Sequence, residues 1–194
     1  MARGRKSQYI SKITNKDKQL LHAFKSCGYL IDKHVSEYVR ERRIAGFVRD
    51  GYVSKHIYYE HKQKQSITLY SLTEKGKKLC QKEMGAKYFY KSSSPRHDLE
   101  VTEKYMSLSQ EQRNTWITEG ELRERVISMD PKYEQRLLDR EISPTDGAYV
   151  VRDGTGLERF ITYEVVTSAY GRQEIRAKEE FATVLKSTIE YTKI

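Results

Sequence analysis

The chain has 194 residues, of which 37% are hydrophobic and 32% are charged, and its formal net charge is +9. This length suits one large domain or two small ones, and we favour two. No run of about 18 apolar residues occurs, and the basic start of the chain is not followed by an apolar segment, so neither a membrane span nor a secretion signal is expected. We therefore expect a cytoplasmic protein in which Cys27 and Cys80 are small buried hydrophobes.

The positive charge is concentrated in the first half of the chain. Residues 1–94 hold 21 Lys and Arg against 8 Asp and Glu, a net charge of +13, whereas residues 95–194 hold 15 against 19, a net charge of −4. A DNA duplex carries a dense array of phosphate charges, so the charge of the first half is typical of a nucleic-acid-binding domain. The charge changes sign beside Pro95, which disfavours helix at the residue before it and indicates a connection between two domains.

Three short helices are predicted near the start of the chain, because apolar residues recur there with helical spacing. Thr14 or Asn15 can cap the first helix, and Gly28 can end it. Asp32 can cap the second helix, and the third covers about residues 40–50. Three short helices with short joints predict a helix-turn-helix unit.

A β-hairpin and a fourth helix follow. Residues 54–61 and 66–72 are rich in β-branched and aromatic residues, and the turn between them, residues 62–65, is basic. Thr73 can then cap a helix over residues 74–84. The order helix, helix, helix, hairpin, helix is that of a winged-helix domain.

The third helix is the predicted recognition helix. The apolar residues that would face the core are Ile44, Phe47 and Val48. Helical geometry then turns Arg42, Gly46 and Arg49 outward, with Arg43 on the flank. Arginine can contact guanine or phosphate with two hydrogen bonds, and a glycine lets the helix backbone approach the groove. The candidate DNA-binding residues on the N-terminal arm, this helix and the hairpin are Arg3, Arg5, Lys6, Arg40, Arg42, Arg43, Gly46, Arg49, Lys55, His56, His61, Lys62 and Lys64.

The second half predicts a small α/β domain. A helix is expected from Arg96 to about Ser109, and residues 130–141 are helical or loose. Strands at residues 147–151 and 160–166 are joined by a Gly-rich turn, and a last helix runs from about Gln173 to near the C-terminus. Helix, hairpin, helix is the layout of restriction-endonuclease-like folds, so we expect an α+β protein with a degenerate core of that kind.

In such folds, two or three carboxylates hold a divalent cation beside a lysine, because the metal must activate water at a phosphate. Asp146 and Glu164 are the candidate catalytic and metal-binding carboxylates, with Glu119 as a third. Val166 stands where the lysine is expected, and Lys178 on the following helix is the candidate replacement. Isolated acids at strand ends are usually surface or stabilising groups. We therefore expect no cofactor, with Mg²⁺ only if the domain is an active endonuclease.

The chain also resembles the replication-relaxation family of plasmids, phages and integrative elements, from about Thr14 to Lys186. The similar segments are residues 28–30, 51–53, 69–76, 97–99, Trp116 with Glu119, 144–146 and 160–165. The resemblance implies a protein that binds an origin-like DNA site and helps to assemble a replication or transfer complex. The family usually continues past Glu164 with another acidic residue and a basic-glycine turn, whereas this chain has Val166, Thr167 and Ser168.

The sequence thus predicts four segments: a basic arm at 1–13, a winged helix-turn-helix domain at 14–91, a linker at 92–96 and an α/β domain at 97–194. The leading hypothesis is a sequence-specific double-stranded-DNA-binding protein of a mobile element. It would act as a homodimer, either as an accessory factor of the relaxosome or of replication, with a relaxase or replication protein as partner, or as a transcriptional regulator. The alternatives are a metal-dependent endonuclease and a scaffold between proteins, and a scaffold would have no measurable affinity for DNA.

Overall fold

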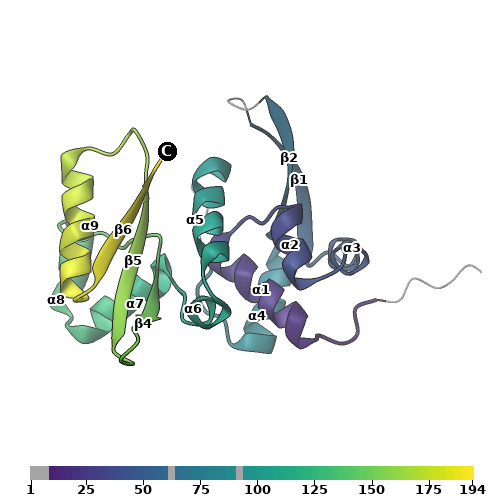
Figure 1. Cartoon of the computed structure of the whole chain (residues 1–194), viewed down its shortest axis with the longest axis horizontal. Coiled ribbons are helices and arrows are strands. Elements are labelled where there is room, and N and C mark those ends of the chain that lie inside the picture. Colours follow the sequence, from purple (N-terminus) through teal and green to yellow (C-terminus); the bar gives the residue numbers. More distant parts are fainter. Residues whose placement is uncertain (1–8, 61–63, 91–93) are drawn as a thin grey trace, which may run out of the picture. The chain divides into compact units, whose positions relative to one another are not determined.

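The computed structural model describes residues 9–60, 64–90 and 94–194. The chain forms two compact units. The first comprises the chain up to Lys25 together with Tyr29–Lys87, and the second comprises Ser26–Gly28 together with Tyr88–Ile194. Each unit combines helices with a sheet, so the protein is α+β (Figure 1). None of the helices among these residues is long and apolar enough to cross a membrane.

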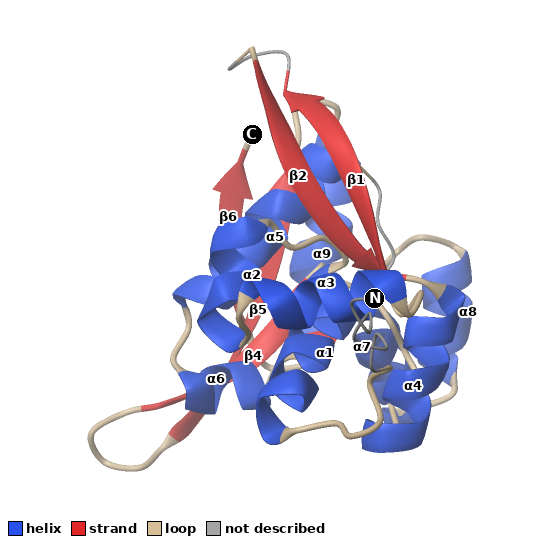
Figure 2. Ribbon diagram, turned by 90° about the vertical axis from the view of Figure 1, so that its right-hand side faces the viewer, coloured by secondary structure: helices blue, strands red, loops and turns tan. Residues whose placement is uncertain are grey.

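The first unit has the predicted order of elements: three helices, a hairpin and a fourth helix. The elements are α1 (Asn15–Cys27), α2 (Asp32–Tyr38), α3 (Glu41–Arg49), β1 (Val53–Glu60), β2 (Gln65–Leu72) and α4 (Glu74–Met84). The two strands pair in antiparallel fashion from Val53 opposite Leu72 to Glu60 opposite Gln65. The hairpin therefore projects from the helices as a two-stranded ribbon (Figure 2).

Local hydrogen bonds fix where α1 and α2 begin. The hydroxyl of Thr14 accepts a hydrogen bond from the N–H of Asp17 (3.2 Å), and the Asp17 carboxylate accepts one from the N–H of Thr14 (2.7 Å). Thr14 is therefore the cap of α1. The prediction that Asp32 caps α2 was wrong. Asp32 is the first residue of that helix, and its carboxylate accepts a hydrogen bond from the hydroxyl of Tyr70 (2.8 Å).

The helices and strands of this unit contribute buried apolar side chains to its core. Its most buried side chains include Leu20, Leu21, Phe24, Ile44, Phe47, Val53, Leu69 and Cys80. Val48, predicted to face the core, is only half-buried. Burial raises the pKa of the Cys80 thiol to about 12, and Cys27 is equally enclosed. Both cysteines are free and buried, as predicted.

The second unit is built on a four-stranded sheet. Its elements are α5 (Pro95–Ser107), α6 (Gln110–Asn114), β3 (Ile117–Thr118), α7 (Glu119–Met129), α8 (Lys132–Leu138), β4 (Gly147–Arg152), β5 (Glu158–Val166), α9 (Arg172–Val184) and β6 (Thr188–Lys193). The strand order is β3-β4-β5-β6. The β4–β5 hairpin is antiparallel, as predicted, and β6 lies parallel to β5.

Two boundaries in this unit differ from the sequence prediction. The last helix ends at Val184, because Lys186 takes a left-handed conformation (φ 51°) and the chain continues as β6. The expected linker over 92–96 also overlaps α5. That helix begins at Pro95, whose fixed φ suits a first helical turn, and Ser94 caps it by accepting the N–H of His97 (3.3 Å).

The two faces of the sheet carry different cores. Residues from α7, α8, α9, β4 and the segment between α8 and β4 pack on one face: Leu122, Val126, Leu137, Ile142, Ala148 and Phe181. On the other face, Trp116 stacks on Tyr149 with ring centres 6.1 Å apart, and Tyr105 of α5 meets Trp116 edge-on at 5.5 Å. Because successive residues of a strand point to opposite faces, Glu164 shares the face of Ala148 and points towards α9.

Candidate nucleic-acid interface and buried acidic network

The exposed face of α3 carries Arg42, Ala45 and Arg49. Gly46 was predicted to face outward with the arginines, but it is half-buried. A Cβ at Gly46 would lie 3.6 Å from the side chain of Ile10, which covers this side of the helix. Ala45 therefore takes the outward position between the two arginines, because the buried side of α3 is centred on Ile44 and Phe47.

Arg43 faces the helices of its own unit. Its guanidinium donates to both carboxylate oxygens of Asp17 (2.9 and 2.6 Å) and to the carbonyl oxygen of Lys12 (2.7 Å), and it lies over the ring of Phe47. The Asp17 carboxylate is almost fully buried. Although burial would raise the pKa of Asp17, hydrogen bonds from Arg43 and Thr14 hold it below its usual value. These contacts give Arg43 a structural part in joining α3 to α1.

Arg49 is exposed but held in place. Its Nε donates to Asp50 Oδ1 (2.7 Å), and its guanidinium lies over the ring of Tyr9. The hydrogen bond from Arg49 lowers the pKa of the Asp50 carboxyl. The other oxygen of Asp50 accepts the N–H of Ile10 (2.7 Å). Arg49 and Asp50 therefore attach the segment before α1 to the end of α3.

Arg40 and Arg42 are exposed at the start of α3, and neither forms an ion pair with any residue of the described ranges. On the hairpin, Lys55, His56 and Lys64 are exposed. His56 hydrogen-bonds Ser54 (2.9 Å). The predicted contacts that lie outside the described residues are Arg3, Arg5, Lys6, His61 and Lys62.

Two exposed apolar residues of the hairpin were not selected from the sequence. Ile57 is 78% exposed and Tyr59 is 47% exposed, and both lie on β1. They alternate along the strand, so they share one face of the ribbon with Lys55. The alternation of these residues in the sequence could have indicated their exposure. An isolated two-stranded ribbon has no second layer of helices or strands to cover an apolar side chain.

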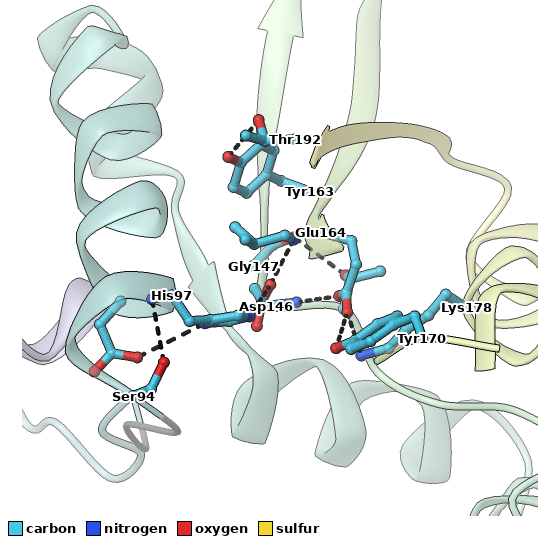
Figure 3. A network of polar contacts seen from close by, with 12 residues as sticks. Ser94, His97, Asp146, Gly147, Tyr163, Glu164, Tyr170, Lys178 and Thr192 are labelled. Carbon is cyan, nitrogen blue, oxygen red and sulfur yellow. Dashed lines mark hydrogen bonds and ion pairs between the residues drawn. The ribbon is translucent and has the colours of Figure 1, made fainter. Parts of the chain in front are cut away.

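The second unit brings Asp146, Glu164 and Lys178 together in one buried network (Figure 3). Lys178 Nζ lies 2.9 Å from Glu164 Oε1, and Glu164 Oε2 accepts the N–H of Asp146 (3.0 Å). Lys178 also donates to the carbonyl oxygen of Pro144 (2.5 Å). The side chains come from the segment before β4, from β5 and from α9, so the tertiary fold places Lys178 beside Glu164.

His97 and Tyr170 complete the network. Neither residue was predicted from the sequence to have a role. His97 Nε2 lies 3.3 Å from Asp146 Oδ2, and the hydroxyl of Tyr170 donates to Glu164 Oε1 (2.9 Å). Glu119 begins α7, and its negative charge contributes to a raised pKa of Tyr170, after the larger effects of burial and of Glu164. The short segment containing His97 resembled the family, but nothing in the sequence indicated Tyr170.

Burial and charge shift the protonation of this network. Burial raises the pKa of the Glu164 carboxyl, and the negative charge of Asp146 raises it further, to about 7. Burial alone would lower the pKa of His97, but hydrogen bonding to the carboxylates of Asp146 and Asp98 raises it to about 10. His97 is therefore an imidazolium at neutral pH, paired with Asp146.

The arrangement does not fit a divalent cation. Both oxygens of Glu164 already accept hydrogen bonds, and Asp146 Oδ2 accepts the N–H of Val165 (2.8 Å) and faces the charged His97. Within the described ranges, no group of three or more His, Cys, Asp or Glu residues could hold a metal ion. A cation would have to displace both Lys178 and His97, so these side chains form an ion-pair network and we derive no catalytic step from them.

Comparisons with known proteins give little further guidance. No protein-family model and no curated protein matches the chain. Among solved structures, it is similar to the crystal structure of Bacillus subtilis PadR in complex with operator DNA. The identity is 15%, the match covers 63% of this chain and 71% of that chain, and the TM-score is 0.26. A TM-score this low does not establish that the two proteins share a fold. Membership of the replication-relaxation family and the restriction-endonuclease-like core therefore stay predictions.

Proposed function

We propose that the protein binds double-stranded DNA sequence-specifically, with α3 in the major groove and the β1–β2 hairpin as a wing against the backbone. The observation that carries this proposal is the outward face of α3. It presents Arg42, which is exposed and without an ion-pair partner among the described residues, next to the small side chain of Ala45. A free arginine can read guanine with two hydrogen bonds, and alanine can contact a thymine methyl group.

The distribution of charge supports the same surface. The first 94 residues have a net charge of +13, which favours contact with phosphates. Arg40 stands at the start of α3, and Lys55 and Lys64 are exposed on the hairpin. Basic residues that flank a recognition helix position it on the duplex without reading sequence.

In this proposal the DNA belongs to a plasmid, phage or integrative element. The protein serves either as an accessory factor of the relaxosome or of replication, or as a transcriptional regulator. A homodimer on a symmetric site would place two recognition helices about one helical turn apart. Selection of bound sequences from random and genomic DNA gives the site, its symmetry and its neighbouring genes, and so distinguishes these roles.

Two adjacent arginines of α3 provide the test of the interface. We expect Arg42→Ala to weaken binding to the selected duplex by about 1–3 kcal/mol and to relax preference at one base pair, without changing thermal stability. Arg43→Ala should lower the thermal stability, because Asp17 would stay buried without its guanidinium partner. Fluorescence anisotropy and thermal unfolding measure the two effects. Unchanged binding by Arg42→Ala, or equal wild-type affinity for every duplex, would contradict the proposal.

The endonuclease alternative has a direct test. Lys178 pairs with the carboxylate of Glu164, and His97 pairs with that of Asp146. We therefore expect the wild-type protein to leave supercoiled plasmid intact with either Mg²⁺ or Mn²⁺. Agarose gel electrophoresis after incubation measures nicking. Nicking by the wild type that Asp146→Asn abolishes would show that the network opens and that the second unit is an enzyme.

A further inference from the structure

A cleft of about 1060 Å³ lies within the second unit, between α8, α9 and the segment that joins α8 to β4. Three arginines from different parts of the chain line it: Arg123 of α7, Arg140 just after α8, and Arg176 of α9. All three are exposed, and none forms an ion pair with another residue that the structure describes. Their guanidinium groups therefore offer several unfilled donors at one site.

The acidic residues of the same cleft form no ion pair with these three arginines, because each carboxylate contacts another group of the described chain. Those pairs are Asp139 with Gln135, Glu141 and Glu180 with Arg136, and Glu174 with the N–H of Gly171. Residues 95–194 have a net charge of −4. Three unpaired arginines gathered in one cleft of an otherwise acidic half indicate a site for an anion.

The backbone at Arg140 points to the same conclusion. Arg140 has a φ of +57° directly after the end of α8, where glycine or asparagine is usual. An L side chain is strained in this conformation. Arginine at this position is therefore less favourable for folding than glycine would be. Binding of a ligand by the Arg140 side chain would account for this choice of residue.

The apolar residues that line the cleft indicate the chemistry of the rest of the ligand. Leu138 is 66% exposed at the cleft, and Ile142 and Ala177 also line it. The volume is large enough for an organic molecule rather than a single inorganic ion. Guanidinium groups match phosphate oxygens with paired hydrogen bonds. We propose that this cleft binds a small organic phosphate of nucleotide size, with its phosphates on Arg123, Arg140 and Arg176 and its organic part against Leu138.

Isothermal titration calorimetry on the full chain tests the site with ATP, GTP, tripolyphosphate and adenosine as probes. We expect the nucleotides to bind one per chain, tripolyphosphate to bind more weakly, and adenosine to bind weakest. Arg123→Gln and Arg176→Gln should each weaken nucleotide binding about tenfold through the loss of a charge-assisted contact. Arg172→Gln is the matched control, because Arg172 is an exposed arginine of the same helix that does not line the cleft. Its affinity should stay within about twofold of the wild type.

Arg140→Gly separates binding from folding. Glycine suits the left-handed backbone, so the melting temperature should stay equal or rise, while nucleotide affinity falls about tenfold. No binding of any probe at about 1 mM would overturn the proposal, as would wild-type affinity in all three cleft variants. Loss of duplex-DNA binding in these variants, without nucleotide binding by the wild type, would also overturn it and make the cleft a DNA contact. The DNA-binding proposal rests on Arg42 and is tested separately.

Discussion

Glu164 illustrates how a single buried residue can be held by its neighbours. Its carboxylate is fully enclosed and is contacted by Lys178, Tyr170 and the N–H of Asp146. A buried ion pair gains little net stability, because both charges lose water, but removing one partner leaves the other charge uncompensated. The network therefore fixes how β5, α9 and the segment before β4 fit together, and it explains why acidic residues stand at strand ends without forming a metal site.

The protonated state of His97 gives a prediction with a definite sign. Its pKa is about 10 in the folded chain, above its ordinary value of 6.5, so its contribution to stability is complete below pH 6.5 and is lost as the pH rises towards 10. We expect His97→Gln to cost about 3 kcal/mol near neutral pH and progressively less at higher pH. Chemical unfolding of both proteins at pH 7.5, 8.5 and 9.5 measures the difference. A cost that does not change with pH would mean that His97 is neutral in the folded protein.

At the scale of elements, α4 depends on a close approach that only glycine permits. A Cβ at Gly76 would lie 2.0 Å from the carbonyl oxygen of Tyr52, to which the hydroxyl and the N–H of Thr73 also donate. The start of α4 is therefore packed directly on the backbone between α3 and β1. This contact gives a physical reason for glycine inside a helix, where it is normally unfavourable.

Gly76→Ala should destabilise the protein by about 1–3 kcal/mol. Helix propensity alone would predict a gain of about 1 kcal/mol for the same substitution, so the sign of the effect separates the two causes. Lys78→Ala is the control, because Lys78 is exposed on the same helix, and its effect should stay within about 0.5 kcal/mol. Thermal or urea unfolding measures all three proteins. A stabilised Gly76→Ala variant would show that α4 is not held against Tyr52.

At the scale of the whole molecule, the separation of charge predicts how salt affects DNA binding. If the basic first half contacts phosphates, the logarithm of the affinity should fall linearly with the logarithm of the salt concentration. Lys64→Ala should reduce the slope by about one unit, since one phosphate contact is lost. Lys132→Ala, an exposed lysine of α8, should leave the slope unchanged. Equal effects of the two substitutions in anisotropy titrations would contradict a phosphate-binding surface confined to the first half.

Much of the fold could be predicted from local patterns. The spacing of apolar residues predicted α1, α2 and α3, and the turn between β4 and β5 carries glycines and an aspartate that suit a hairpin. The helix α7 and the strand β6 were missed. Polar and apolar residues alternate over residues 188–193, as they do in strands. This strand is stabilised by parallel pairing with β5, however, and a helix followed by a parallel strand leaves only a weak signal in the local sequence.

The sequence by itself determined the order of the elements in the first unit, the segregation of positive charge and the candidate carboxylates, because spacing, propensity and charge are local properties of the chain. Only the tertiary structure decided that Arg43 binds Asp17, that Ile10 covers Gly46, and that Lys178 meets Glu164. These pairs are separated by many residues, so no local pattern encodes them. Packing of distant segments therefore decides which cations remain available to a ligand.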